Sequence, residues 1–326
     1  MRRKRLIIGS RGSDLALWQS RWVQEKLKER FPDLEVSIET IKTKGDRVLD
    51  APLSKIGDKG LFTKEIENAL IAREIDIAVH SLKDLPTQLP EDLRIGAVCE
   101  REDVRDVFIP HPTNSVGTLL DQPRGARVAT GSLRRKCQLL NLRPDVEIID
   151  IRGNLNTRMK KLDESDWAGM ILAHAGVVRL GWQDRIGEVI DVEKILPAVG
   201  QGALGIEIRE NDREVEELVA VLHHTATAQA AMAERALLRA LEGGCQIPIG
   251  AYTRIETDER GERRLVLDAM VGSLDGKRIV RGKHHGYPSE AENIGEKLAD
   301  VLIAGGADRI LSEIRLATRP VQQVEV

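Results

Sequence analysis

Apolar residues in the first hundred positions follow two alternating spacings. Short apolar or alternating runs, which are typical of strands, occupy residues 5–9, 34–42 and 75–79. Apolar residues three or four positions apart, which are typical of helices, occupy residues 13–30 and 63–73. Because strands alternate with helices, this block predicts an α/β domain with a largely parallel sheet.

The same alternation repeats in the next block. Strands are predicted at residues 126–130, 146–151 and 169–172, and helices at 132–142 and 155–162. Two such blocks predict two α/β domains with a cleft between them.

The pattern changes after about residue 222. A helix rich in Ala and Leu is predicted at 228–241, followed by strands at 251–256, 265–272 and 278–283 and a last helix at 289–304. An Asp-Gly pair between the last two strands is typical of a tight hairpin turn. The predicted fold class is therefore α/β: two α/β domains flank a cleft, and a smaller C-terminal α+β domain carries a three-stranded antiparallel sheet.

The composition narrows the possible functions. The 326 residues include 49 Lys and Arg against 52 Asp and Glu, a net charge of −3, with only 4 Trp, 2 Tyr and 3 Phe. A near-neutral chain with so few aromatic rings is a poor match for a protein that coats nucleic acid or stacks against its bases. No apolar run approaches the ~18 residues of a membrane-spanning helix.

The N-terminus and the cysteines indicate the compartment. Only three apolar residues, Leu6 to Ile8, follow the basic start, so we interpret it as a solvated tail rather than a secretion signal. Cys99, Cys137 and Cys245 lie far apart and form neither a CxxC pair nor a disulfide framework. We therefore expect a cytoplasmic protein that does not enter a membrane.

Cationic and hydroxyl side chains recur where the predicted strands end, which is where open α/β sheets bind ligands. Residues 122–144 contain six basic residues and no acidic one. Such a run is often only a solvated helix face. Because it coincides with a strand end, and because Thr130, Gly131 and Ser132 open the next helix, we interpret it as an anion site.

Two residues leave two interpretations open. Asp84, beside Lys83 at a strand end, is either a capping aspartate or a carboxylate that works in a cationic cleft. Cys245 is either a small buried side chain, the more common case, or a thiol presented by the glycine-rich loop around it. The sequence contains no dinucleotide, Walker, HExxH or paired-cysteine motif, so no metal is predicted.

An ordered series of motifs resembles the porphobilinogen deaminase family, also called the hydroxymethylbilane synthases. The resemblance runs from about Leu6 to about Glu313. Any one motif alone would be weak, whereas the ordered set is specific. In chain order the motifs are Arg11-Gly12-Ser13, Thr43 to Asp46, Lys55 to Phe62, His80 to Pro86, Gly131 to Arg135, Arg152-Gly153-Asn154, Leu196 to Ala203 and Glu242 to Gly250.

The resemblance implies three domains in a monomeric protein. The first two would have the fold of two-lobed periplasmic binding proteins, with the chain crossing between them twice. Domain 1 is expected at residues 1–102 and 200–221, domain 2 at 103–199, and domain 3 at 222–326.

The resemblance also implies a transferase of tetrapyrrole, porphyrin and haem biosynthesis. Such an enzyme condenses four porphobilinogen molecules head to tail with loss of ammonia. It then releases hydroxymethylbilane by hydrolysis, for a downstream uroporphyrinogen synthase. The growing chain is held by a dipyrromethane cofactor, which a thioether would attach to Cys245, and no metal is required.

The family's functional residues are assigned by position. Asp84 matches the catalytic aspartate, which would assist proton transfer to the departing amine and stabilise the resulting cation. Gln19 and Gln201 are expected to support the site. The residues expected to bind the carboxylates of the pyrroles are Arg11, Ser13, Lys55, Lys59, Ser81, Lys83, Thr130, Gly131, Ser132, Arg134, Arg135, Arg152, Arg158 and Arg179. Gly131 stands where many relatives have a hydroxyl residue, and only its backbone N–H can donate.

Two rival functions share part of this pattern. A non-catalytic, two-lobed anion-binding protein would have the same α/β domains and arginines, but no use for a third domain with a Gly-Gly-Cys loop. A nucleic-acid binder that used residues 122–144 would conflict with the net charge and the scarcity of aromatic residues.

Overall fold

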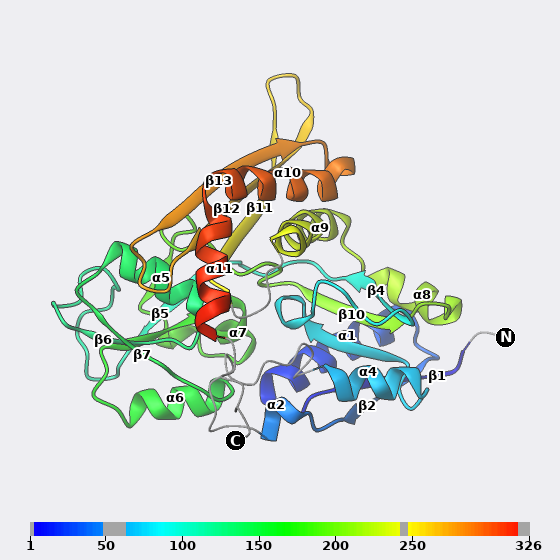
Figure 1. Cartoon of the computed structure of the whole chain (residues 1–326). Coiled ribbons are helices and arrows are strands. Elements are labelled where there is room, and N and C mark those ends of the chain that lie inside the picture. The colour runs from blue at the N-terminus through cyan, green and yellow to red at the C-terminus, as the bar shows by residue number, and fades with distance from the viewer. Residues whose placement is uncertain (1–2, 48–62, 242–246, 319–326) are drawn as a thin grey trace, which may run out of the picture.

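The computed structural model describes residues 3–47, 63–241 and 247–318. The strands of these residues form three sheets, each in its own part of the molecule (Figure 1). Two are five-stranded α/β sheets, and the third is a three-stranded antiparallel sheet near the C-terminus. The predicted fold class is therefore confirmed.

The first sheet joins N-terminal strands to a strand from much later in the chain. Three strands are parallel, and the fourth is antiparallel to both of its neighbours. In spatial order the strands are β2 (Glu35–Thr40), β1 (Arg5–Ser10), β3 (Ile77–Ser81), β10 (Leu204–Arg209) and β4 (Leu93–Val98). The helices of this part are α1 (Asp14–Arg30), α2 (Lys44–Arg47), α4 (Lys64–Ile71) and α8 (Arg213–Val219).

The second sheet repeats this arrangement. Its fourth strand is again antiparallel to both neighbours. In spatial order the strands are β7 (Glu147–Ile149), β6 (Arg127–Ala129), β8 (Gly169–Ala173), β5 (Asp106–Pro110) and β9 (Glu188–Ile190). Its helices are α5 (Leu133–Leu142), α6 (Leu155–Asp163) and α7 (His174–Arg179). Since β5 follows β4 in the chain and β10 follows β9, the chain crosses between the two sheets twice, as predicted.

The C-terminal part lies above the other two in Figure 1. Its strands are β11 (Ile249–Thr257), β12 (Arg263–Gly272) and β13 (Ile279–Gly286), and its helices are α9 (Thr225–Ala240), α10 (Ala291–Ala304) and α11 (Ala307–Thr318). Leu237, Leu267 and Leu298 are fully buried in a core shared by the sheet, α9 and α10.

The hairpin turn between β12 and β13 contacts α5, a helix of the second part. Gly276 adopts a φ of 72° at the predicted Asp-Gly turn, a conformation that glycine adopts readily. A side chain there would also collide with α5, because its Cβ would lie 2.6 Å from the Cys137 carbonyl oxygen. The Asn141 side chain of α5 donates to the Gly276 carbonyl at 2.9 Å. The turn is therefore docked against the helix.

The predicted elements are present, with ends shifted by a few residues. One shift concerns the site, since β3 runs to Ser81 and includes His80 and Ser81, which were expected to follow the strand. Strands β4, β5, β9 and β10 and helices α2, α7, α8 and α11 were not predicted. No helix in the described part of the chain is long and apolar enough to cross a membrane. The residue boundaries of the three domains stay predictions.

Candidate active site

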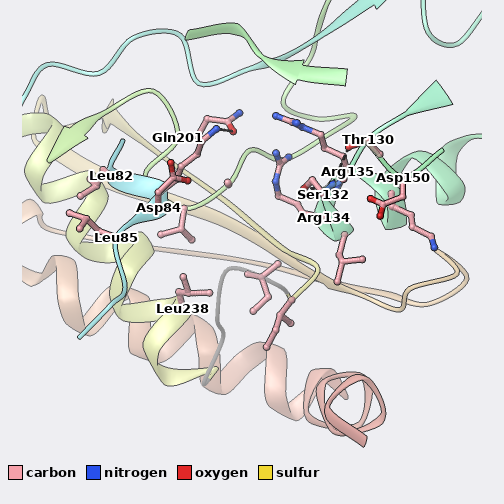
Figure 2. Close-up of a pocket in the computed structure, with 18 of the residues that line it drawn as sticks. Leu82, Asp84, Leu85, Thr130, Ser132, Arg134, Arg135, Asp150, Gln201 and Leu238 are labelled. Atoms are coloured by element: carbon pink, nitrogen blue, oxygen red, sulfur yellow. Dashed lines mark hydrogen bonds between the residues drawn. The ribbon is translucent and has the colours of Figure 1, made fainter. Parts of the chain in front are cut away.

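A cavity of about 470 Å³ lies where the three parts of the molecule meet (Figure 2). The short 3-10 turn η1 (Leu82–Asp84), directly after β3, lines it from the first part. The start of α5 and the segments after β6 and β7 line it from the second. Arg235 and Leu238 of α9, with Ile247 and Ile249, line it from the third. The cavity therefore draws its lining from chain segments that are far apart in the sequence.

Asp84 ends the η1 turn and presents an exposed carboxylate to the cavity. The next residue, Leu85, is extended, so Asp84 does not stand at the N-terminus of a helix. The interpretation of Asp84 as a capping residue is therefore not supported. Figure 2 shows Asp84 and Gln201 on one side and Arg134 and Arg135 on the other.

The start of α5 places two neighbouring arginines at the cavity. Ser132 is the N-cap residue, and its Oγ accepts a hydrogen bond from the Arg135 N–H. Arg134 and Arg135 lie in the first turn and are only 4% and 6% exposed. Both still line the cavity.

A buried carboxylate that the sequence patterns did not indicate, Asp106, joins these arginines. Its Oδ2 accepts from Arg134 Nη1 and its Oδ1 from Arg135 Nη2, both at 2.7 Å. Burial raises the pKa of Asp106, but the two guanidinium groups outweigh burial and hold that pKa well below its usual range. The one sequence signal for it is an acid that begins a fully apolar run, Val107 to Ile109.

Arg152 and Arg158 extend the cationic lining. Asn154 caps α6 by accepting from the Thr157 N–H at 2.9 Å, and Arg158 follows in the next turn. Burial, together with Arg135 and Arg152, lowers the pKa of Arg158 to about 10, so its guanidinium is still cationic at neutral pH.

Thr130 and Gly131 line the cavity just before α5. A Cβ at Gly131 would lie 2.5 Å from the Ile151 carbonyl oxygen. The two segments that carry the cationic residues therefore approach each other more closely here than a side chain allows.

Lys83 connects η1 to the buried carboxylate. Its Nζ donates to Gln201 Oε1 at 3.4 Å, and Gln201 Nε2 donates to Asp106 Oδ1 at 2.8 Å. Burial lowers the pKa of Lys83 to about 8, with Asp84 opposing that change. Gln201, expected as a supporting residue, thus bridges the lining from the first and second parts.

Other predicted site residues have contacts away from the described cavity lining. Ser13 caps α1, with its Oγ accepting from the Ala16 N–H at 3.4 Å. Gln19 Nε2 donates to Ser81 Oγ at 2.8 Å. Arg179 donates to the Gly202 carbonyl at 2.7 Å, and its guanidinium lies 5.7 Å from the centre of the Trp18 ring.

Arg11 is likewise not among the residues found to line the cavity. Lys55, Lys59 and Cys245 lie outside the described residues. The roles assigned to all of these residues stay predictions.

The third part contributes a second residue that the patterns did not indicate. Arg235 of α9 donates from Nη1 to the Leu85 carbonyl at 3.2 Å and from Nη2 to the Pro86 carbonyl at 2.6 Å. It also lines the cavity. It therefore connects α9 to the segment directly after Asp84.

The fold separates the basic residues of 122–144 into some that pair with acidic residues and others that line the cavity. Arg143 pairs with Asp145 at 2.7 Å, and Arg127 pairs with Asp166 on the surface. Within the run, the basic residues that line the cavity are Arg134, Arg135 and Lys136. Acidic residues from outside the run thus neutralise part of it, and a smaller set of cations faces the cavity.

The described lining combines seven cationic with two anionic side chains, and the anions are Asp84 and Asp150. Such a balance suits a small ligand that carries several carboxylates. The described residues include no group of three His, Cys, Asp or Glu side chains that could hold a metal ion.

The sequence of the chain is similar to that of proteins in a known family. The family model described as porphobilinogen deaminase, dipyrromethane cofactor binding domain, matches residues 6–217, and the model of the porphobilinogen deaminase C-terminal domain matches residues 228–304. The porphobilinogen deaminase of Carboxydothermus hydrogenoformans is 53% identical over 313 residues, covering 96% of this chain and 98% of the relative.

The porphobilinogen deaminase of Chlorobium luteolum is 55% identical over 317 residues, covering 96% of this chain and 99% of the relative. Among solved structures, the periplasmic VFT2 domain of Bordetella pertussis BvgS is matched with 13% identity and a TM-score of 0.41. That match covers 67% of this chain and 86% of the BvgS domain.

Proposed function

The chain belongs to the porphobilinogen deaminase family, and from this premise we propose that it is a hydroxymethylbilane synthase, a transferase of porphyrin biosynthesis. It condenses four porphobilinogen molecules head to tail with loss of ammonia, and then releases the product by hydrolysis. The observation that carries the proposal is the cavity, where an exposed carboxylate, Asp84, faces a cluster of buried arginines.

The charge of the cavity suits this substrate. Each porphobilinogen carries an acetate and a propionate group, so a growing chain brings many carboxylates into one place. Taking those charges out of water is unfavourable unless cations pair with them. Seven cationic side chains in the lining supply such partners.

The family's dipyrromethane cofactor fits the same donor set. Its two pyrrole units carry four carboxylates, and the buried Arg135 Nε has no hydrogen-bond partner among the described residues. We assign its carboxylates to Arg134, Arg135, Arg152 and Arg158, and its covalent attachment to Cys245. When bound, the cofactor supplies the pyrrole carbon to which the first substrate unit is joined.

Asp84 is the proposed catalytic residue. An exposed carboxyl group at a cavity wall can donate a proton to the departing amine of the substrate when it is protonated, and the carboxylate that remains can accept a proton after coupling. It also stabilises the positive charge that the substrate carries once ammonia has left. Because the short η1 turn holds Asp84 directly after β3, the fold fixes its position against the sheet.

The remaining assignments complete the proposal. Gln19 orients Ser81 through the hydrogen bond between them. We propose a cytoplasmic monomer whose product passes to a uroporphyrinogen synthase. Further carboxylate contacts are assigned to Arg11, Ser13, Lys55, Lys59, Ser81, Lys83, Thr130, Gly131, Ser132 and Arg179.

A non-catalytic anion-binding protein is not favoured. The family match extends into the C-terminal part at residues 228–304, for which a two-lobed binding protein has no use.

Intact-protein mass spectrometry tests the proposal. The purified wild-type protein should carry the mass of two pyrrole units, and Cys245→Ser should lack both that mass and the release of ammonia from porphobilinogen. Cys137→Ser is the matched control, because Cys137 is buried in α5 and should leave cofactor attachment intact. Active wild-type protein of unmodified mass would contradict the assignment of Cys245.

A further inference from the structure

Asp106, the first residue of β5, is a fully buried carboxylate with a complete set of donors. Arg134 Nη1 and Arg135 Nη2 each donate to it at 2.7 Å, and Gln201 Nε2 donates at 2.8 Å. Both carboxylate oxygens are therefore engaged, each by a guanidinium group. Charge-assisted bonds of this length are among the strongest hydrogen bonds in proteins.

The two arginines need such a partner. They are neighbours in the first turn of α5, and both are almost fully buried. Burial lowers the pKa of Arg134, Asp106 opposes that change, and the like charge of Arg135 adds to it. A carboxylate between the guanidinium groups offsets their repulsion and leaves one net positive charge for a ligand.

The contacts of Arg134 and Arg135 with the protein leave some of their N–H donors for a ligand in the cavity. Arg134 Nη1 also donates to the Leu196 carbonyl at 2.7 Å, and Arg135 Nη1 donates to the Ile171 carbonyl at 3.0 Å. A guanidinium has five N–H donors, so these bonds fix its plane without using every donor. Arg135 Nε is buried with no partner among the described residues, although Arg135 lines the cavity.

Gln201 connects Asp106 to the η1 turn, which holds Asp84. Its amide nitrogen donates to Asp106, while its amide oxygen accepts from Lys83, the neighbour of Asp84. The Gln201 side chain also donates to the Val104 carbonyl at 2.8 Å and is fully buried. One continuous chain of hydrogen bonds thus connects the arginines on α5 to η1.

We propose that Asp106 is a positioning residue, which holds Arg134 and Arg135 in the orientation that binds ligand carboxylates and, through Gln201, aligns them with Lys83. Asp106 acts through the arginines and is not assigned a contact with the ligand. This inference rests on the proposed function, since the ligand carboxylates are those of porphobilinogen and of dipyrromethane.

Asp106→Asn tests the proposal, because it keeps the shape of the side chain and removes its charge. Asp145→Asn is the matched control, since Asp145 pairs with Arg143 at 2.7 Å in the same part of the molecule and does not line the cavity. The readouts are KM for porphobilinogen and kcat per cofactor-loaded site, with loading counted by intact mass. The thermal midpoint of unfolding is measured alongside.

For Asp106→Asn we expect KM to rise about 10-fold or more, because the arginines lose their shared anchor, while kcat per loaded site stays within about 3-fold. Asp145→Asn should leave both constants unchanged. A lower loaded fraction of folded protein would also support the proposal, because Arg134 and Arg135 are assigned to the carboxylates of the cofactor. A purely structural role for Asp106 would lower the unfolding midpoint but leave both the loaded fraction of folded protein and KM per loaded site unchanged, and that result would overturn the proposal.

A second variant keeps the test decisive where Asp106→Asn yields no folded protein. Gln201→Met removes one of the three donors to Asp106 and should raise KM about 3-fold or more. An unchanged KM in folded, loaded Gln201→Met would overturn the proposal. Failure of the proposed function is distinguishable, because the wild-type protein itself would then lack the two pyrrole units and release no ammonia.

Discussion

Arg235 connects α9 to the segment that follows Asp84, and its removal is expected to slow the chemical step. Its guanidinium donates to the Leu85 and Pro86 carbonyls at 3.2 and 2.6 Å. These are the two residues directly after the η1 turn, so Arg235 fixes where that turn ends. Arg235→Met keeps a long, unbranched side chain and removes both donors.

The expected magnitude follows from these two bonds. A hydrogen bond from a charged group contributes about 1.5–3 kcal/mol, and the bond at 3.2 Å is the weaker one. The free energy of unfolding should therefore fall by about 2–4 kcal/mol. Because a shift of about 1 Å in a catalytic group can cost about 10²-fold, kcat per loaded site should fall by about 10- to 100-fold.

The assay is single-turnover release of ammonia by cofactor-loaded protein, with thermal unfolding measured in parallel. Arg239→Met is the matched control, because Arg239 lies one turn further along α9 and pairs with Glu292 at the surface. An exposed pair of this kind contributes little, so the control should behave like the wild type. Loaded Arg235→Met that releases ammonia at the wild-type rate would refute the positioning of Asp84 by Arg235.

Three further predictions concern the cavity wall. Asp84→Asn should fold and retain cofactor but turn over at least ~10²-fold more slowly, and near-normal ammonia release would contradict its role. Lys83, with a pKa of about 8, is cationic below that pH and neutral above it, so KM should rise as the pH increases through about 8. Lys83→Arg should abolish this rise of KM with pH, because arginine stays cationic. Identical KM–pH profiles for the wild type and Lys83→Arg would show that Lys83 does not cause the rise. Gly131→Ser places a Cβ 2.5 Å from the Ile151 carbonyl and should lower stability by about 1–3 kcal/mol in denaturant titrations, whereas an unchanged midpoint would show that the segment relaxes.

Local signals in the sequence were sufficient to predict most of the helices and strands. The caps at Ser13 and Ser132 and the Asp-Gly turn act within a few residues, so the pattern around them predicts the element that follows. Strand β10 was not predicted, although Leu204, Ile206 and Ile208 alternate with Gly205, Glu207 and Arg209. The strand is buried on both faces because Glu207 and Arg209 have buried partners, His80 and Asp76, from other elements, and the local pattern does not reveal those partners.

The arginine site was only partly predictable. The motif around Arg134 and Arg135 identified the cations, but their partner Asp106 lies 28 residues before Arg134 in the chain. Arg235 lies 150 residues after Leu85, whose carbonyl it binds. Asp106 meets Arg134 only when the second part folds, and Arg235 meets Leu85 only when α9 docks against the first part. Neither hydrophobic spacing nor capping residues carry that information.

The position of β10 inside the first sheet has a consequence for the order in which a newly synthesised chain can assemble. In that sheet β10 lies between β3 and β4 and pairs with both of them. The first sheet therefore cannot be completed until residue 209 has left the ribosome. The second sheet draws all its strands from residues 106–190 and can close first. During synthesis the middle of the polypeptide is thus complete before its beginning, and the unpaired edges of β3 and β4 are open to wrong partners in the interval.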